Sequence, residues 1–196
     1  MNKTLRFHIK GLKPLIPHNN RTVNPRGPIT IAMKAITGKP AKQKTEEDIV
    51  LLSDLEWEAG LYYEPDIGPY IPGGNFEVGM ERAAMKVKKG LKDKIKAGIT
   101  SNGNWPLIYD GPRDMESLKI DERFRICKPM NVVGKKINRT RPFFKEWECN
   151  VELTYDTQEV EEDEVVACFS KLASGVGMCD ERPRYGRFEV KGMERL

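Results

Sequence analysis

Histidine and cysteine, the side chains that most often bind zinc, are scarce in this sequence of 196 residues. The two histidines, His8 and His18, lie far along the chain from all four cysteines. No two cysteines have the Cys-x-x-Cys spacing of a zinc or redox motif. We therefore expect no metal site, and we expect reduced thiols, which are the rule in a cytoplasmic protein.

Long apolar runs and the common nucleotide-binding motifs are missing as well. No apolar run approaches the roughly 20 residues that cross a bilayer, and the first residues lack the apolar region of a signal peptide. The sequence has no P-loop, no Rossmann glycine pattern and no serine nucleophile elbow. These absences predict a cytoplasmic protein with no membrane partner and no cofactor. They count against the common enzyme classes without excluding every one.

Charged residues are plentiful and nearly balanced. Lysine and arginine number 33 against 29 acidic residues, so the net charge is only +4. A hydrophobic fraction of 39% is typical of a globular chain with a real core. A charge this small permits nucleic-acid binding but does not argue for it, so the distribution of the cations decides.

Alternating apolar and polar residues mark two half-buried strands, from Leu5 to Lys10 and from Trp147 to Tyr155. Arg6, His8 and Lys10 would share the outer face of the first strand, where they form either a nucleic-acid platform or a solvated sheet face. An acidic run and an amphipathic helix follow the second strand, and the helix ends at Gly175. A glycine-rich loop then leads to a last strand.

This order of elements predicts an α+β fold with a ferredoxin-like, RRM-like antiparallel sheet, helices and insertions. We expect a single domain, 1–196, although no RNP1 signature of an RNA-recognition motif is present. Its predicted segments are core strands near 4–10, 145–155 and 186–191 and an insertion at roughly 17–75.

Local signals predict further elements. A short helix is expected over 29–36, and Thr45 is expected to cap a second helix. Trp57 is expected in an extended segment after that helix. Asn75 is expected to cap the clearest helix, whose apolar positions recur at spacings of three and four from Phe76 to Leu91.

Three cationic segments are candidates for phosphate contact. The first is the basic end of the long helix, the second a run of four cations in seven residues beside Phe143 and Phe144, and the third the final loop. Charges next to aromatic rings suit a single strand, whose phosphates are bound while its bases stack. The alternatives are a solvated surface, and core anchors for the two phenylalanines. The candidate nucleic-acid-binding residues are Lys86, Lys89, Lys135, Lys136, Arg139, Arg141, Arg182, Arg184, Tyr185 and Arg187.

The final loop combines glycines, arginines and a tyrosine between a helix and a strand. Glycine permits backbone angles closed to other residues, and arginine offers a planar set of donors that suits phosphate. Two acids, Asp180 and Glu181, interrupt the cations. The loop is interpreted either as a mobile holder of a nucleic-acid backbone or as a long surface turn.

Taken with the preceding helix and the following strand, this loop resembles the RAMP superfamily, the RNA-binding proteins of CRISPR systems. The residues that carry the resemblance are Gly175, Gly177, Arg182, Arg184, Gly186 and Arg187. It implies a backbone-type subunit that coats RNA in the cytoplasm of a prokaryotic host. The segment Gly-Arg-Phe-Glu-Val near the end is also similar to phage or mobile-element proteins.

Three functions remain open. The first is a non-enzymatic protein that holds single-stranded RNA or DNA, as a homo-oligomer along the strand or as a subunit of a ribonucleoprotein. The second is a metal-independent endoribonuclease with His18 as general base, although the neighbouring sequence shows no second titratable partner for it. The third is a viral structural or inhibitor protein whose basic surface meets an acidic protein.

Overall fold

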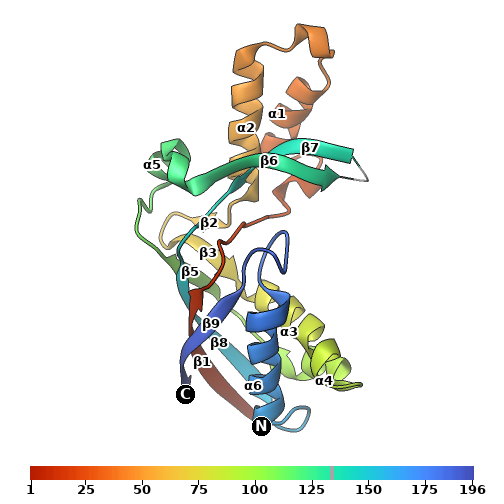
Figure 1. The fold of residues 1–196 in the computed structure, drawn as a ribbon, viewed down its shortest axis with the longest axis vertical. Helices are drawn as coiled ribbons and strands as arrows, with labels where there is room; N and C mark the ends of the chain where they lie inside the picture. Colours follow the sequence, from red (N-terminus) through yellow and green to blue (C-terminus); the bar gives the residue numbers. More distant parts are fainter. Residues whose placement is uncertain (133–134) are drawn as a thin grey trace.

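The protein, represented by a computed structural model, has a sheet-and-helix core at one end and a helical hairpin with a two-stranded arm at the other (Figure 1). The structure describes the backbone of residues 1–132 and 135–196 and the side chains of residues 1–129 and 137–196. The main sheet has the strand order β2-β3-β5-β8-β1-β9, and β4 also pairs with β8. The core elements are β1 (Asn2–Gly11), α3 (Gly73–Val87), α4 (Leu91–Gly98), β4 (Ile99–Thr100), β5 (Asn104–Ile108), β8 (Glu148–Asp156), α6 (Glu162–Lys171) and β9 (Phe188–Arg195).

Two interleaved strand–helix–strand units make up this core. Strand β1 lies between β8 and β9 and runs antiparallel to both, so β8, α6 and β9 form one split unit around it. Strands β4 and β5 run antiparallel to β8, so β1, α3 and these strands form the second unit around β8. This arrangement is the ferredoxin-like antiparallel sheet with insertions that the sequence predicts.

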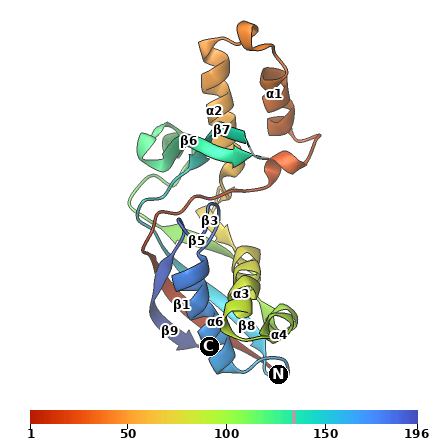
Figure 2. The ribbon, with the colours of Figure 1, turned by 45° about the vertical axis from the view of Figure 1, so that its right-hand side comes forward.

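One face of the sheet is covered by helices α3, α6 and α4 (Figure 2). Leu5, Phe7 and Ile9 of β1 point to this side and are at most 1% exposed. The rings of Phe7 and Phe169 stack with their centroids 4.0 Å apart, which joins the sheet to α6. The period-two pattern of the first strand therefore identifies the buried face correctly.

The opposite face of β1 carries the cations that the sequence places there, but each has an acidic partner. Arg6 contacts Glu152 on the neighbouring strand at 2.7 Å, and both His8 and Lys10 contact Glu148, at 2.8 and 3.4 Å. The register places Arg6 directly opposite Glu152 and Lys10 opposite Glu148. The open face is thus a neutralised, solvated surface rather than a cationic platform.

The first insertion separates β1 from α3 and forms the helical hairpin. Helix α2 begins with the predicted cap, because the Thr45 hydroxyl accepts from the Asp48 amide at 3.2 Å and the Asp48 carboxylate accepts from the Thr45 amide. The sequence pattern predicted Trp57 in an extended segment after this helix. That prediction is wrong, because Trp57 lies inside the helix. The elements are η1 (Arg21–Val23), α1 (Pro28–Thr37), η2 (Ala41–Gln43), α2 (Glu46–Gly60), β2 (Tyr63–Glu64) and β3 (Gly68–Pro72).

A second insertion lies between β5 and β8 and packs against α2. Ser53 and Thr140 share a hydrogen bond of 2.7 Å between their hydroxyls, and the Trp57 indole donates to the carbonyl of Phe124 at 2.9 Å. Phe144 is fully buried and is therefore a core anchor, whereas Phe143 is half-buried. The elements are α5 (Met115–Ile120), η3 (Glu122–Phe124), β6 (Arg125–Val132) and β7 (Lys135–Pro142).

Two predictions about the long helix are wrong. Asn75 lies inside α3 and does not cap it, because the helix begins at Gly73 after Pro72. The backbone of Gly73 donates to Gly103 at 2.7 Å, and a Cβ atom there would lie 1.6 Å from the carbonyl oxygen of Ser101. The helix also ends at Val87, and Gly90, with φ of +82°, separates it from α4.

Candidate nucleic-acid interface

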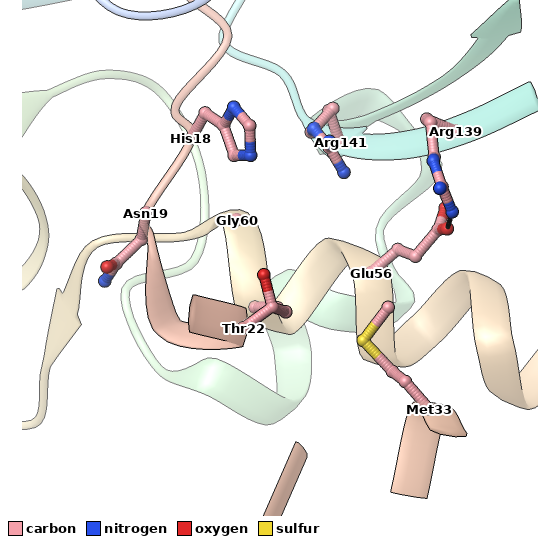
Figure 3. Close-up of a pocket in the computed structure, with 9 residues that line it drawn as sticks. His18, Asn19, Thr22, Met33, Glu56, Gly60, Arg139 and Arg141 are labelled. Atoms are coloured by element: carbon pink, nitrogen blue, oxygen red, sulfur yellow. Dashed lines mark hydrogen bonds and ion pairs between the residues drawn. The ribbon is translucent and has the colours of Figure 1, made fainter. Parts of the chain in front are cut away.

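A hollow of about 240 Å³ lies where the two insertions meet the chain that follows β1 (Figure 3). His18 and Arg141 lie along one side, Met33 and Thr22 lie across from them, and the pair of Arg139 and Glu56 closes a third side. The last turn of α2 lines the hollow with Ala59 and Gly60. Residues from four separate stretches of the chain therefore build one recess.

A second hollow of about 320 Å³ shares His18 with the first. Helix α3 contributes Asn75 and Val78, and the final loop contributes Asp180 and Arg182. Because both hollows meet at His18, we call them together the His18 groove. Its full lining is His18, Asn19, Asn20, Thr22, Met33, Glu56, Ala59, Gly60, Tyr62, Asn75, Val78, Arg139, Arg141, Cys179, Asp180 and Arg182.

Cations continue beyond the groove along α3. Arg82 and Lys86 follow Val78 at intervals of four residues, which places all three on one helix face. Burial, followed by the positive charge of Arg82, lowers the pKa of Arg182. Lys86 is exposed, and its amine donates to the carbonyl of Gly175 at 3.2 Å. A cationic path therefore runs from the arm to the end of α3.

The final loop, residues 177–187, is attached along its backbone. The amides of Asp180 and Gly186 donate to the carbonyls of Ile16 and Pro14 at 3.0 and 2.8 Å. Gly186 has φ of +69°, and a Cβ atom there would lie 2.0 Å from the carbonyl oxygen of Met178, so no other residue fits. The loop is therefore joined at two points of its backbone to the segment that follows β1.

The two acids that interrupt the loop hold it to the rest of the molecule. Glu181 pairs with Lys128 on β6. Asp180 lies 3.3 Å from Nδ1 of His18, and this contact, more than any other, lowers the pKa of the Asp180 carboxyl. Lys128 also sits over the ring of Tyr185, 4.2 Å from its centroid, so one face of that ring is covered.

Charge compensation is incomplete inside the groove. Burial is the largest influence on Arg141 and Arg182 and lowers the pKa of both, against the effect of Asp180. The Arg141 side chain is 13% exposed, and its Nε lies 3.9 Å from Asp180 with no hydrogen-bond partner among the described residues. In contrast, carboxylate partners raise the pKa of three arginines outside the groove, which are Arg6, Arg123 and Arg195.

Four of the residues singled out in the sequence meet in the groove: His18, Arg139, Arg141 and Arg182. Lys86 extends the same path. The others line neither hollow: Lys89 and Arg184 are exposed, Tyr185 is covered on one face, and Arg187 is half-buried. The side chains of Lys135 and Lys136 lie outside the residues that the structure describes.

Comparison with solved structures finds weak structural likenesses. A chain in the cryo-EM structure of the type III-B Cmr-beta complex bound to cognate target RNA resembles this protein with a TM-score of 0.49 and 10% sequence identity. The match covers 100% of this chain and 61% of the chain in the complex. This protein therefore spans less than two thirds of the length of that chain. No family model and no curated protein matches the sequence. The RAMP resemblance therefore stays a prediction.

Several groove residues carry no local sequence signal. Glu56 is a single acid in a helix, and Asp180 reads as an interruption of a basic loop. Asn19 belongs to a polar loop, and Met33 lies on a short apolar helix. Arg82, which lies beyond the groove on α3, could have been selected, since it precedes Lys86 by one helical turn within the basic segment.

The groove offers no obvious metal or thiol chemistry. Within the described residues, no three His, Cys, Asp or Glu side chains form a cluster that could hold a metal ion. Cys179 lines the second hollow, but burial raises the pKa of its thiol to about 12, so it is protonated at neutral pH and a poor nucleophile. Among all the residues that the structure describes, no helix combines the length and apolar character needed to span a bilayer.

Proposed function

We propose that the protein binds single-stranded nucleic acid along the His18 groove and the adjoining face of α3. The observation that carries this proposal is the pair Arg141 and Arg182, which are recessed, charged and incompletely compensated on the two sides of His18. A phosphate would supply the missing counter-charge and hydrogen-bond acceptors. A flexible single strand can enter such a recess, whereas the stiff backbone of a duplex cannot follow it inward.

We further propose that several copies bind side by side on a long strand. The two hollows, of about 240 and 320 Å³, have room for only a few nucleotides. One copy would therefore leave most of a long strand uncovered, and coating would require a homo-oligomer or a larger ribonucleoprotein.

Titration of a labelled single-stranded oligonucleotide at increasing salt tests the proposal. If three to five phosphates contact the cationic path, the logarithm of the binding constant should fall with the logarithm of the salt concentration with a slope of about −2 to −3.5. Fluorescence anisotropy measures this slope, and a duplex of equal length is the control. Binding that is absent, unaffected by salt or equally tight for the duplex would contradict the proposal.

One observation favours a second function, a metal-independent endoribonuclease. The sequence shows no partner for His18, but the fold brings Asp180 to 3.3 Å from its Nδ1. A carboxylate on one ring nitrogen orients the imidazole and supports it as a base, which leaves the other nitrogen to take a proton from a 2′-hydroxyl.

Incubation of end-labelled RNA with the protein and with the His18→Ala variant, in the presence of a chelator, separates the two functions. A pure binding protein should leave the RNA intact in both reactions. An endoribonuclease that uses His18 should cut the RNA, and the variant should cut about 10²-fold or more slowly. Equal cleavage by both proteins would exclude His18 as the base.

A further inference from the structure

We infer that the first hollow of the groove is a pocket for one unstacked nucleobase of the bound strand. This inference rests on the proposed binding of a single strand and goes beyond it, because it assigns a ligand to a particular recess. The hollow has a volume of about 240 Å³, below the roughly 300–1,000 Å³ of pockets for drug-sized molecules. It suits a single flat ring system better than a larger ligand.

The walls of the pocket combine apolar and polar surfaces in the way that a base requires. Met33 from α1 and Ala59 from α2 offer apolar contacts to the ring faces. A methionine sulfur beside an aromatic ring is favourable by about 0.3–1.5 kcal/mol, and the flexible side chain adapts to the ring that enters. Gly60 brings bare backbone to the recess, because a Cβ atom there would lie 2.9 Å from Cδ of Pro142.

The pair of Glu56 and Arg139 supplies the polar side. The Glu56 carboxylate accepts from Arg139 and from the Thr140 amide at 2.9 Å, and its side chain is 5% exposed. A carboxylate has about four acceptor positions and a guanidinium five donors, so both groups keep capacity for a ligand. Together they present donors and acceptors side by side, as the edge of a base does.

The position of the charges favours a base over a phosphate in this hollow. Glu56 would repel an anion that lay against it, and its negative charge is already matched by Arg139. Arg141 lies on the side with His18, across from Met33, and is the incompletely compensated cation. The backbone of the strand would therefore follow Arg141 and His18, while one base turns inward toward Met33.

The methyl group of Met33 provides a direct test, because an aromatic ring beside it shifts its NMR signal upfield. We would label the methionine methyl groups with ¹³C, assign Met33 by the loss of its signal in the Met33→Leu variant, and add single-stranded RNA. The expected result is an upfield shift for Met33. Met193, on strand β9 of the main sheet and outside the groove, is the control and should not shift.

A strand of the same length whose nucleotides lack bases separates base entry from backbone binding. This strand should bind through its phosphates and leave the Met33 signal where it is in the free protein. If normal RNA binds but Met33 does not shift, or if the baseless strand shifts it equally, the pocket is not a base pocket and strand binding stands. If anisotropy shows no binding at all, the proposed function fails and the pocket fails with it.

Discussion

Replacing both Arg141 and Arg182 with glutamine is expected to weaken the binding of single-stranded nucleic acid by on the order of 10²-fold. A hydrogen bond to a charged group contributes about 1.5–3 kcal/mol, and a change of about 1.4 kcal/mol is tenfold in affinity. Two lost phosphate contacts should also reduce the slope of the salt dependence by about 1.4. Anisotropy titrations at several salt concentrations measure both quantities.

The matched control removes two positive charges elsewhere. Arg6 and Arg195 lie outside the groove, and each is already compensated, Arg6 by Glu152 and Arg195 by Glu162. The double replacement of these two by glutamine changes the net charge equally, yet it should alter affinity only slightly. If the two double variants lose affinity to the same extent, binding depends on overall charge and not on the groove.

The Glu56→Ala variant is expected to be the least stable of the single replacements in the groove. Glu56 joins α2 to β7 through Arg139 and the Thr140 amide, and it is almost fully buried. Removing one partner of a buried ion pair costs about 3–5 kcal/mol, because the other charge remains without compensation. For a chain of this length, that loss should lower the melting temperature by on the order of 10 °C in a calorimetric or fluorescence scan.

Glu58, two residues along the same helix, provides the comparison. It pairs with Lys119 at 3.3 Å, and both side chains are about 30% exposed, at 32% and 29%. Such a pair contributes about 0–1 kcal/mol, so the Glu58→Ala variant should melt within a few degrees of the unchanged protein. Equal destabilisation by the two replacements would show that the contact between Glu56 and Arg139 is not a main support of the arm.

The two central strands of the sheet could be predicted from the sequence because each carries its own pattern. Alternation in β1 and β8 follows from one buried and one solvated face, which a few neighbouring residues reveal. The cap at Thr45 is equally local, since it involves only Asp48, three positions later. Asn75 gave a similar local signal and misled, because tight backbone contacts at Gly73 set the start of α3 instead.

The groove could be predicted only in part, because its contacts join distant segments. His18 and Asp180 are in contact although most of the chain separates them. Lys128 contacts Glu181 and Tyr185, which lie more than 50 residues further along the chain. A cluster of cations in the sequence does not reveal which acidic side chains pair with them in the fold. The sequence therefore did not show that the cations of β1 and Arg139 have carboxylate partners. The pairing of carboxylates with some arginines and not others appears only when the chain is folded.

The spread of the groove lining along the chain has a consequence during synthesis. The groove needs both His18 and Arg182, which lie far apart along the chain, and the insertions between them supply its walls. A nascent chain on the ribosome therefore cannot complete the groove until Arg182 has emerged. Chains that stop before Arg182 would lack part of the groove, and with it part of the proposed binding site.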